Sequence, residues 1–295
     1  MIPVTVIGGY LGAGKTTLVN HLLRNANGVR LAVLVNEFGE LAIDEDLIEA
    51  QDDDVISIAG GCVCCSFGSD LTAALADMAA MEPKPDHVLI ESSGVAIPSS
   101  IVNSLVFLPA FRSDGIVILA DAETVQKSAR DKYMGDTVTR QISDADIILL
   151  NKVDLVSKAA LDATRMWLQV QNRDVRIVES TQSVVPPETV LDSFIGRARS
   201  GGEHFEAAHL DMLTLMPQRA VDADALAAAL ADEGAGLVRA KGFVTRSDGR
   251  KALIQVVGRR FEVSDASAEK ADGVVCLGFK DVMSRDVLEA LVIDV

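Results

Sequence analysis

The stretch GYLGAGKT, residues 9–16, decides the fold class of the first part of the chain. It fits the pattern G-x-x-x-x-G-K-[ST], follows the apolar run Val4–Gly8 and opens a stretch with helical character. Glycines let backbone N–H groups turn inward around phosphates, and the N-terminus of the next helix favours negative charge. We therefore predict a phosphate-binding loop between a strand and a helix. The alternative, a glycine-rich turn with an incidental lysine, fits this context poorly.

The residues of this loop have different expected roles. Gly9, Gly12 and Gly14 are expected to wrap the backbone around the phosphates. Lys15 is expected to reach the β- and γ-phosphates and to act in catalysis, and the Thr16 hydroxyl is expected to ligate Mg²⁺.

Short apolar runs, each followed by a turn and a helical stretch, recur up to about residue 180. The runs are Val4–Gly8, Leu31–Asn36, Val55–Ala59, His87–Glu91, Gly115–Asp121, Asp146–Asn151 and Val175–Glu179. Their nearly continuous apolar character is typical of strands that are covered on both faces. We predict a doubly wound α/β domain with a mostly parallel sheet over residues 1–200.

A second, smaller α/β domain is expected over residues 208–295. The segment GRARSGGEHFE, residues 196–206, is polar and without periodicity, which indicates a linker. After it we predict strands at Met212–Met216, Leu237–Thr245 and Ala252–Val257, and helices at Ala223–Asp232 and Arg285–Leu291.

The sequence NKVD, residues 151–154, follows an apolar strand and has the pattern of a guanine-reading motif. An ionised Asp154 only accepts hydrogen bonds, so it can take both the N1–H and the 2-amino group of guanine. Adenine offers neither donor, and the unpaired carboxylate would cost about 1–3 kcal/mol. We therefore expect Asn151, Lys152 and Asp154 to select GTP over ATP. A chance occurrence of the motif is the alternative.

The sequence HVLIESSG, residues 87–94, is an apolar strand that ends in a carboxylate. In P-loop enzymes an acid at this position supports Mg²⁺ or its waters, and a glycine amide nearby senses the γ-phosphate. Glu91 is therefore a candidate catalytic residue and Gly94 a candidate nucleotide contact. The alternative is a surface acid that ends a strand.

The bulk composition excludes two classes of partner. The 295 residues carry a formal net charge of -16, which argues against nucleic acid and against an anionic membrane surface. The apolar runs are far shorter than the roughly 18 residues of a membrane helix, and we find no secretory signal at the N-terminus. We expect a cytoplasmic protein.

Three of the four cysteines, Cys62, Cys64 and Cys65, form a cluster after the strand VISIA. Three thiolates suit a soft or borderline ion such as Zn²⁺, Cu(I) or Co²⁺ and leave one coordination position open. An inert buried trio and a redox pair remain alternatives. Cys276, in the apolar run VVCLGF, is expected in a core.

Taken together, these motifs resemble the CobW-type GTPases, a family of cobalamin-synthesis proteins and metallochaperones. The resemblance rests on GGYLGAGKTT, VNEFGE followed by Ile43 and Asp44, GGCVCC, ESSG followed by Pro98, NKVD and LVRAKG. It covers nearly the whole chain, and it implies that GTP binding and hydrolysis drive the loading or release of a metal, most plausibly Zn²⁺ or Co²⁺. A metal-receiving client protein is implied as partner.

The resemblance also assigns roles residue by residue. Ala13 and Thr17 join the nucleotide-binding residues, and Glu37 becomes a catalytic candidate beside the γ-phosphate. Glu40 becomes a carboxylate neighbour of the metal site formed by Cys62, Cys64 and Cys65.

Two features depart from the family's pattern or remain open. The segment after Val175–Glu179 matches the second guanine-contacting loop poorly, so that contact stays unassigned. No arginine finger or water-activating glutamine is evident, so a homodimer partner or the client is a candidate source. Two rival functions remain: a GTP-dependent conformational chaperone for a cofactor enzyme, and a metal carrier whose GTP site only stabilises the fold.

Overall fold

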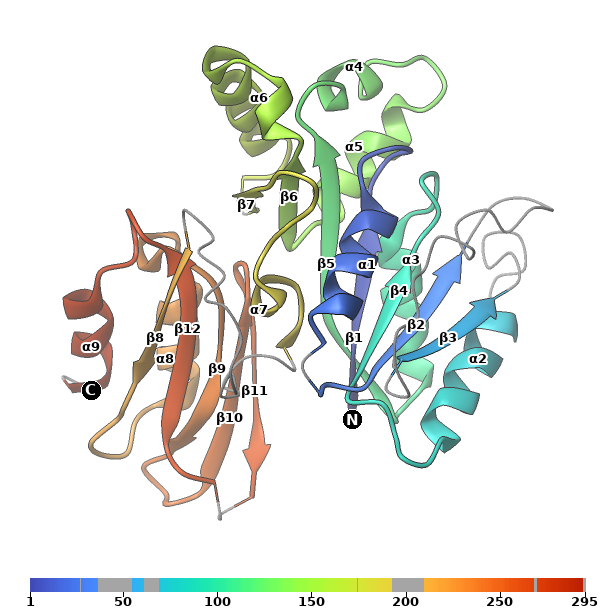
Figure 1. The fold of residues 1–295 in the computed structure, drawn as a ribbon. Coiled ribbons are helices and arrows are strands. Elements are labelled where there is room, and N and C mark those ends of the chain that lie inside the picture. Colours follow the sequence, from blue (N-terminus) through green and yellow to red (C-terminus); the bar gives the residue numbers. More distant parts are fainter. Residues whose placement is uncertain are drawn as a thin grey trace. The chain divides into compact units, whose positions relative to one another are not determined.

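The computed structural model describes residues 1–26, 28–36, 55–60, 69–173, 175–192, 210–267 and 270–293. The chain divides into two compact units, Met1–Pro187 and Glu188–Val295 (Figure 1). The predicted linker at residues 196–206 lies outside the described residues, so the predicted domain limits of 200 and 208 stay predictions. No helix within the described ranges has the length and apolar composition needed to cross a bilayer.

The first unit contains, in its described residues, a seven-stranded sheet in the order β3-β2-β4-β1-β5-β6-β7 (Figure 1). All neighbouring strands in it are parallel. The strands are β1 Ile2–Gly8, β2 Leu31–Asn36, β3 Val55–Gly60, β4 His87–Glu91, β5 Phe111–Asp121, β6 Ile147–Asn151 and β7 Arg176–Glu179. Every predicted strand is therefore confirmed, and β5 begins four residues earlier than the sequence indicated.

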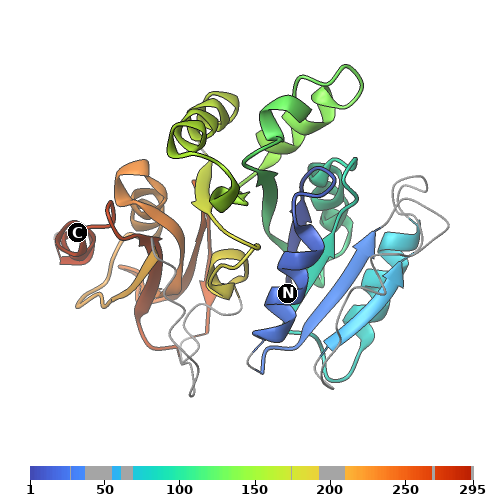
Figure 2. The ribbon, with the colours of Figure 1, turned by 45° about the horizontal axis from the view of Figure 1, so that its top comes forward.

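Helices cover both faces of this sheet, as the apolar strands required. The helices are α1 Lys15–Arg24, α2 Ser69–Ala80, α3 Pro98–Ser104, α4 Val125–Ser128, α5 Gly135–Asp144 and α6 Lys158–Gln171, with short 3-10 turns η2 Leu105–Phe107 and η3 Val153–Leu155. The short helix α7, Pro187–Val190, contains the boundary between the two units, and residues 188–190 of it belong to the second. Helices α2 and α3 pack with Val4, Val6 and Ile90 on one face, and α1 lies on the other (Figure 2). Because all five residues of β4 are buried, this central strand is inaccessible from either side.

The parallel register gathers the strand ends at one edge of the sheet. Ile7 of β1 lies opposite Glu91 of β4, and Asp121 of β5 lies opposite Asn151 of β6. Ligands of open α/β sheets bind outside the carboxyl ends of the strands. The strand order alone therefore brings together the residues that follow β1, β4, β5, β6 and β7.

The second unit is built on an antiparallel sheet with the strand order β11-β10-β9-β12-β8. Its elements are β8 Leu210–Leu215, α8 Ala223–Ala231, η5 Glu233–Ala235, β9 Leu237–Thr245, β10 Lys251–Val257, β11 Arg260–Ala266, β12 Gly273–Phe279 and α9 Arg285–Ile293. Leucines of α8 and α9 pack on one face of this sheet. The sequence reading missed β11, an edge strand with no clean apolar alternation, and recognised in β12 only a core segment.

Cys276 of β12 is confirmed as a core residue. It is fully buried in the cluster beneath α8 and α9, and burial raises the pKa of its thiol to about 12. At neutral pH this thiol is therefore protonated and poorly suited to bind metal.

The opposite face of the second sheet carries a buried arginine from the LVRAKG stretch. Arg239 is fully buried, and its Nε and Nη2 donate to the carbonyls of Thr189 and Val190 at 2.8 and 2.6 Å. Lys241 Nζ pairs with Asp192 Oδ1 at 2.6 Å. The basic residues of LVRAKG therefore hold the first residues of the unit, 188–192, against the sheet.

The glycine of the same stretch has a steric reason. A Cβ at Gly242 would overlap the carbonyl of Gly273 on the neighbouring strand β12. LVRAKG indicates little as a sequence motif, but in the structure its residues explain how the strands and the first residues of the second unit pack together.

We predict that Arg239→Leu destabilises the second unit by about 3 kcal/mol, because two buried carbonyls lose a charged donor. Chemical denaturation of the whole protein measures this. The matched control is Arg250→Leu, since Arg250 is exposed and pairs only at the surface with Asp248 and Asp265, where such changes usually stay within about 0.5 kcal/mol. Equal stability of the two variants would contradict the anchoring role.

Candidate functional site

The glycine-rich segment between β1 and α1 forms a tight loop. Gly9, Gly12 and Gly14 have φ angles of 131°, 74° and 105°, a region that side chains with a Cβ rarely adopt. Gly14 is the N-cap of α1, and the buried Lys15 extends back across the loop, where its Nζ donates to the Gly9 carbonyl at 3.0 Å. The first helical turn and the lysine therefore face the same loop, as phosphate binding requires. Thr17 lies in that turn and is exposed.

Two of these glycines also allow close packing. A Cβ at Gly9 would overlap the Leu119 carbonyl of β5. A Cβ at Gly14 would lie 2.6 Å from Asn151 Nδ2 and 2.7 Å from Ser183 Oγ. The loop therefore packs directly against the last residue of β6 and against the loop that follows β7.

Thr16 and Glu91, both predicted near Mg²⁺, are brought together. The Thr16 hydroxyl donates to Glu91 Oε1 at 2.9 Å, and Glu91 is only 3% exposed at the end of β4. A hydroxyl and a carboxylate are hard oxygen donors of the kind that Mg²⁺ prefers. This donor set fits a magnesium ion beside a bound triphosphate.

Gly94, predicted to approach the γ-phosphate, lies against the phosphate loop. A Cβ at this position would be 2.7 Å from a methyl carbon of Leu11. The Gly94 carbonyl accepts from Gln141 Nε2 at 3.2 Å. The segment after Glu91 is therefore anchored to α5 on one side and to the loop on the other.

Asn151 joins three segments through one carboxamide. Its Nδ2 donates to the Ala13 carbonyl and to Ser183 Oγ, each at 2.9 Å. Its Oδ1 accepts from the Ser183 backbone N–H at 2.9 Å and from Ser180 Oγ at 3.2 Å. The residue is buried, so the predicted guanine-reading asparagine also fixes the phosphate loop to the loop after β7.

The two other predicted guanine contacts differ in exposure. Lys152 has a φ of 61° and its Nζ pairs with Asp121 Oδ2 at 2.6 Å. Asp154 lies in η3 and is exposed at the same edge. The NKVD turn is thus held in place by Asn151 and Lys152, and it presents the carboxylate of Asp154 to solvent.

Sequence reasoning missed three residues of this region. Ser180 and Ser183 come from the loop after β7, which was left unassigned, and Ser183 Oγ also donates to the Gly14 carbonyl at 3.0 Å. Asp121 ends the apolar strand β5. The available signal was positional: Asp121 is the last residue of a predicted strand, and Ser180 and Ser183 follow another, with both carboxyl ends expected at the same edge of the sheet.

His21 ties helix α1 to the residues just after Ser183. Its Nε2 lies 2.7 Å from the Val185 carbonyl and therefore carries the proton, while Nδ1 lies 3.4 Å from Asn25 Nδ2. Burial, and to a lesser extent Arg24, lowers the pKa of His21 below its usual 6.5, although the bond to Val185 opposes this shift.

The remaining predicted site residues, Glu37, Glu40, Cys62, Cys64 and Cys65, lie outside the described residues. Within the described part of the chain, no group of three or more His, Cys, Asp or Glu side chains is placed to hold a metal ion. The metal ligands predicted from the sequence therefore remain a prediction.

Comparison with family models divides the chain much as the fold does. The model for the CobW/HypB/UreG nucleotide-binding domain matches residues 3–179. The model for the cobalamin synthesis protein cobW C-terminal domain matches residues 210–292.

Individual relatives extend this similarity. The zinc chaperone CobW of Sinorhizobium sp is 29% identical, with 98% of this chain and 96% of that protein covered. Zinc-regulated GTPase metalloprotein activator 1 of Schizosaccharomyces pombe is 34% identical over 61% of this chain, which spans 46% of that protein. The crystal structure of Zn(II)-bound YjiA GTPase from E. coli has the same fold, with a TM-score of 0.50, 22% identity and coverage of 98% and 97% of the two chains.

We predict that Gly14→Ala lowers nucleotide affinity at least tenfold, because the added Cβ would push Asn151 and Ser183 away from the loop. Titration with a fluorescent guanine nucleotide measures this. Gly28→Ala is the matched control: Gly28 has a similar positive φ of 77° but open space around its Cβ position. A Gly14→Ala protein that binds nucleotide normally would contradict the packing described here.

We predict that the free energy of unfolding falls as the pH drops below about 6.5, in part because of His21. The folded-state pKa of His21 is lowered, so the unfolded chain takes up a proton that the folded chain resists. This stability is present above the unfolded pKa and is lost as the pH falls towards the folded pKa. Urea denaturation at pH 7.5 and 5.5 should show a smaller pH effect in His21→Gln, and an identical effect in both proteins would refute the assignment.

Proposed function

Because the chain belongs to the CobW/HypB/UreG family and is a P-loop GTPase, we propose that it is a GTP-dependent metallochaperone. In this proposal Cys62, Cys64 and Cys65 bind a transition-metal ion, with Zn²⁺ or Co²⁺ as the candidate metals. The state of the nucleotide then controls transfer of that ion to a client protein.

One observation carries this proposal: the register of strands β2, β3 and β4. Val35 of β2 lies opposite both Ala59 of β3 and Glu91 of β4, and Asn36 lies opposite Gly60. The chain therefore enters the EFGE segment and the cysteine motif at the same level of the sheet, next to the acid expected beside Mg²⁺. The ends of β2 and β3 thus lie at the level of the sheet where a γ-phosphate and its metal ion would be sensed.

The chemistry of hydrolysis is assigned to residues of the same edge. Thr16 and Glu91 would hold Mg²⁺, which when bound neutralises charge on the β- and γ-phosphates. Lys15 contributes a positive charge to those phosphates, and the amides of the loop around Gly12 and Gly14 orient them. Glu37 remains a candidate partner of Mg²⁺ or of a water molecule beside the γ-phosphate, and the group that activates the attacking water is unassigned.

Selection of guanine is assigned to the turn after β6. Asp154 is exposed at the end of the turn and accepts from the two donors that only guanine offers. Asn151, the first residue of this turn, connects it to the phosphate loop through the hydrogen bond to the Ala13 carbonyl.

The relatives support zinc as the first metal to test. One is named a zinc chaperone, and another is named a zinc-regulated GTPase metalloprotein activator. Cobalt remains in the proposal because three thiolates bind both ions. The expected partners are a metal-receiving client and, as a source of the missing catalytic group, a second copy of the chain.

The rival function is a GTP-dependent conformational chaperone whose thiols do not bind metal. The stoichiometry of bound Zn²⁺ in purified protein separates the two: close to one ion per chain supports the metallochaperone, and none supports the rival.

We predict that a non-hydrolysable GTP analogue and GDP give Zn²⁺ affinities that differ by roughly 5- to 150-fold, the usual range of coupling between two sites. Competition with a chromophoric chelator measures both affinities. Zn²⁺ must change the GTP affinity by the same factor, because coupling of binding free energies is reciprocal.

Cys64→Ala and Cys65→Ala should abolish this coupling while GTP binding persists in metal-free buffer. Cys276→Ala is the control, since this buried thiol belongs to the core of the second unit. Indistinguishable Zn²⁺ affinities in the two nucleotide states would exclude nucleotide-controlled delivery.

A further inference from the structure

We propose that Asp121 is a positioning residue that sets guanine selectivity by holding Lys152 and, through it, the turn that carries Asp154. The inference rests on the proposed reading of guanine by this turn. It begins with the ion pair between Lys152 Nζ and Asp121 Oδ2, whose atoms are 2.6 Å apart. The side chains are 33% and 10% exposed, so the pair is partly withdrawn from solvent.

Lys152 needs such a restraint because its backbone is strained. Its φ of 61° lies in the left-handed region, which is unfavourable for a residue with a Cβ. The neighbouring contacts are weaker: Val153 N–H donates to the Ser180 carbonyl at 3.4 Å and Leu155 N–H to the Lys152 carbonyl at 3.1 Å. The lysine side chain thus ties this turn to the end of β5.

Asp121 is a rigid partner for this link. Its Oδ1 accepts from the backbone N–H groups of Glu123 and Thr124 at 2.9 and 3.3 Å, which leaves Oδ2 for Lys152. The residue is 8% exposed, and the next residue, Ala122, donates its N–H to the Asn151 carbonyl at 2.9 Å. Strand register, a backbone hydrogen bond and the ion pair therefore join the ends of β5 and β6.

The position of Asp154 depends on the backbone of this turn. Within the described residues, the structure gives its side chain no hydrogen bond and no ion pair, and it is exposed. Its position is therefore set through the backbone, by Asn151 and Lys152 at the start of the turn. If Lys152 relaxes, the carboxylate that distinguishes guanine from adenine moves with it.

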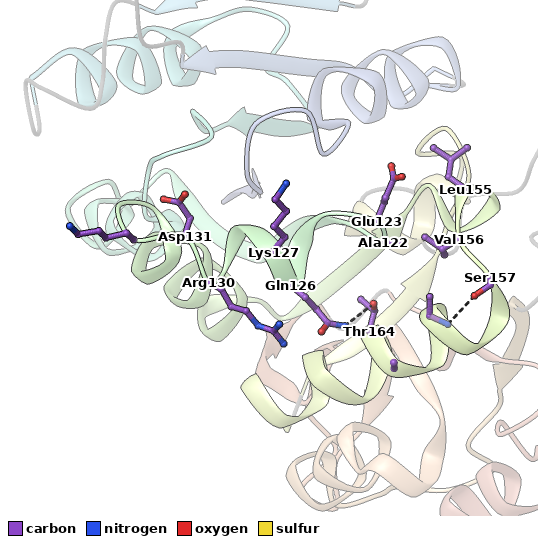
Figure 3. Close-up of a pocket in the computed structure, with 13 residues that line it drawn as sticks. Ala122, Glu123, Gln126, Lys127, Arg130, Asp131, Leu155, Val156, Ser157 and Thr164 are labelled. Atoms are coloured by element: carbon purple, nitrogen blue, oxygen red, sulfur yellow. Dashed lines mark hydrogen bonds between the residues drawn. The ribbon is translucent and has the colours of Figure 1, made fainter.

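A groove lies next to the two segments that the Lys152–Asp121 ion pair connects. The segments that follow Asp121 and Asp154 line opposite sides of an open groove of about 920 Å³ (Figure 3). Figure 3 shows Glu123 on one side and Leu155 and Ser157 on the other, with a hydrogen bond of 3.0 Å from Gln126 to Thr164 farther along the groove. The Lys152–Asp121 ion pair and the Gln126–Thr164 hydrogen bond are therefore two polar side-chain links between these segments, in addition to the apolar packing of Ala122 and Val125 near Val153 and Val156.

The test compares Asp121→Asn with Asp131→Asn in the full-length protein. Asp131 is a matched control: its Oδ1 accepts from two backbone N–H groups, those of Tyr133 and Met134, in the same way, but no lysine of the NKVD turn pairs with it. We expect Asp121→Asn to weaken GTP binding roughly tenfold and to lower the ratio of GTP to ATP affinity, with Asp131→Asn unchanged. Equal losses for GTP and ATP would show a general structural defect and overturn the inference.

A double-mutant cycle with Lys152→Met keeps the inference testable if one variant folds poorly. We expect Asp121→Asn combined with Lys152→Met to bind GTP no more weakly than the worse single variant, because both changes break one link. Fully additive losses would show that the two residues act independently, contrary to the inference.

The two levels of the proposal fail differently. If the unmutated protein has no preference for GTP over ATP, the assignment of Asp154 fails. If the preference exists and Asp121→Asn keeps it, only the positioning role of Asp121 fails.

Discussion

The site depends on the hydrogen bonds made by the buried carboxamide of Asn151. It donates to the phosphate loop at Ala13 and accepts from the loop after β7 at Ser183, while its own backbone starts the NKVD turn. An amide suits this position because it offers donors and acceptors at once. Three loops from three strands are therefore held in one geometry, and the residues predicted to bind phosphate and to read the base share a single support.

The parallel sheet makes this support possible and connects it to the proposed metal site. The described strands of the first unit end at the same edge, and the last residues of β2 and β3 lie level with Glu91. A change at the γ-phosphate would therefore act on segments that are neighbours through the sheet, and no long path through side chains is needed. Coupling of this kind requires two states of those segments, which is why affinity measurements in both nucleotide states carry the proposal.

The second unit contributes no comparable cluster among its described residues. Its LVRAKG stretch is explained by anchoring, through Arg239 and Lys241, and by the close approach of strands at Gly242. These packing roles explain why LVRAKG has these residues although the stretch contains no catalytic pattern.

The sequence by itself determined the phosphate loop, the seven strands and the guanine motif, because each depends on local chemistry: glycine conformation, apolar runs and hydrogen-bonding capacity at fixed spacing. The edge strand β11 escaped detection because an exposed edge imposes little periodicity. Only the tertiary structure decided that Asp121 pairs with Lys152, that Ser183 completes the support of Asn151 and that Arg239 binds backbone carbonyls. These partners are 31, 32 and 49 to 50 residues apart in the chain, and their pairing follows from strand order, which no local pattern encodes.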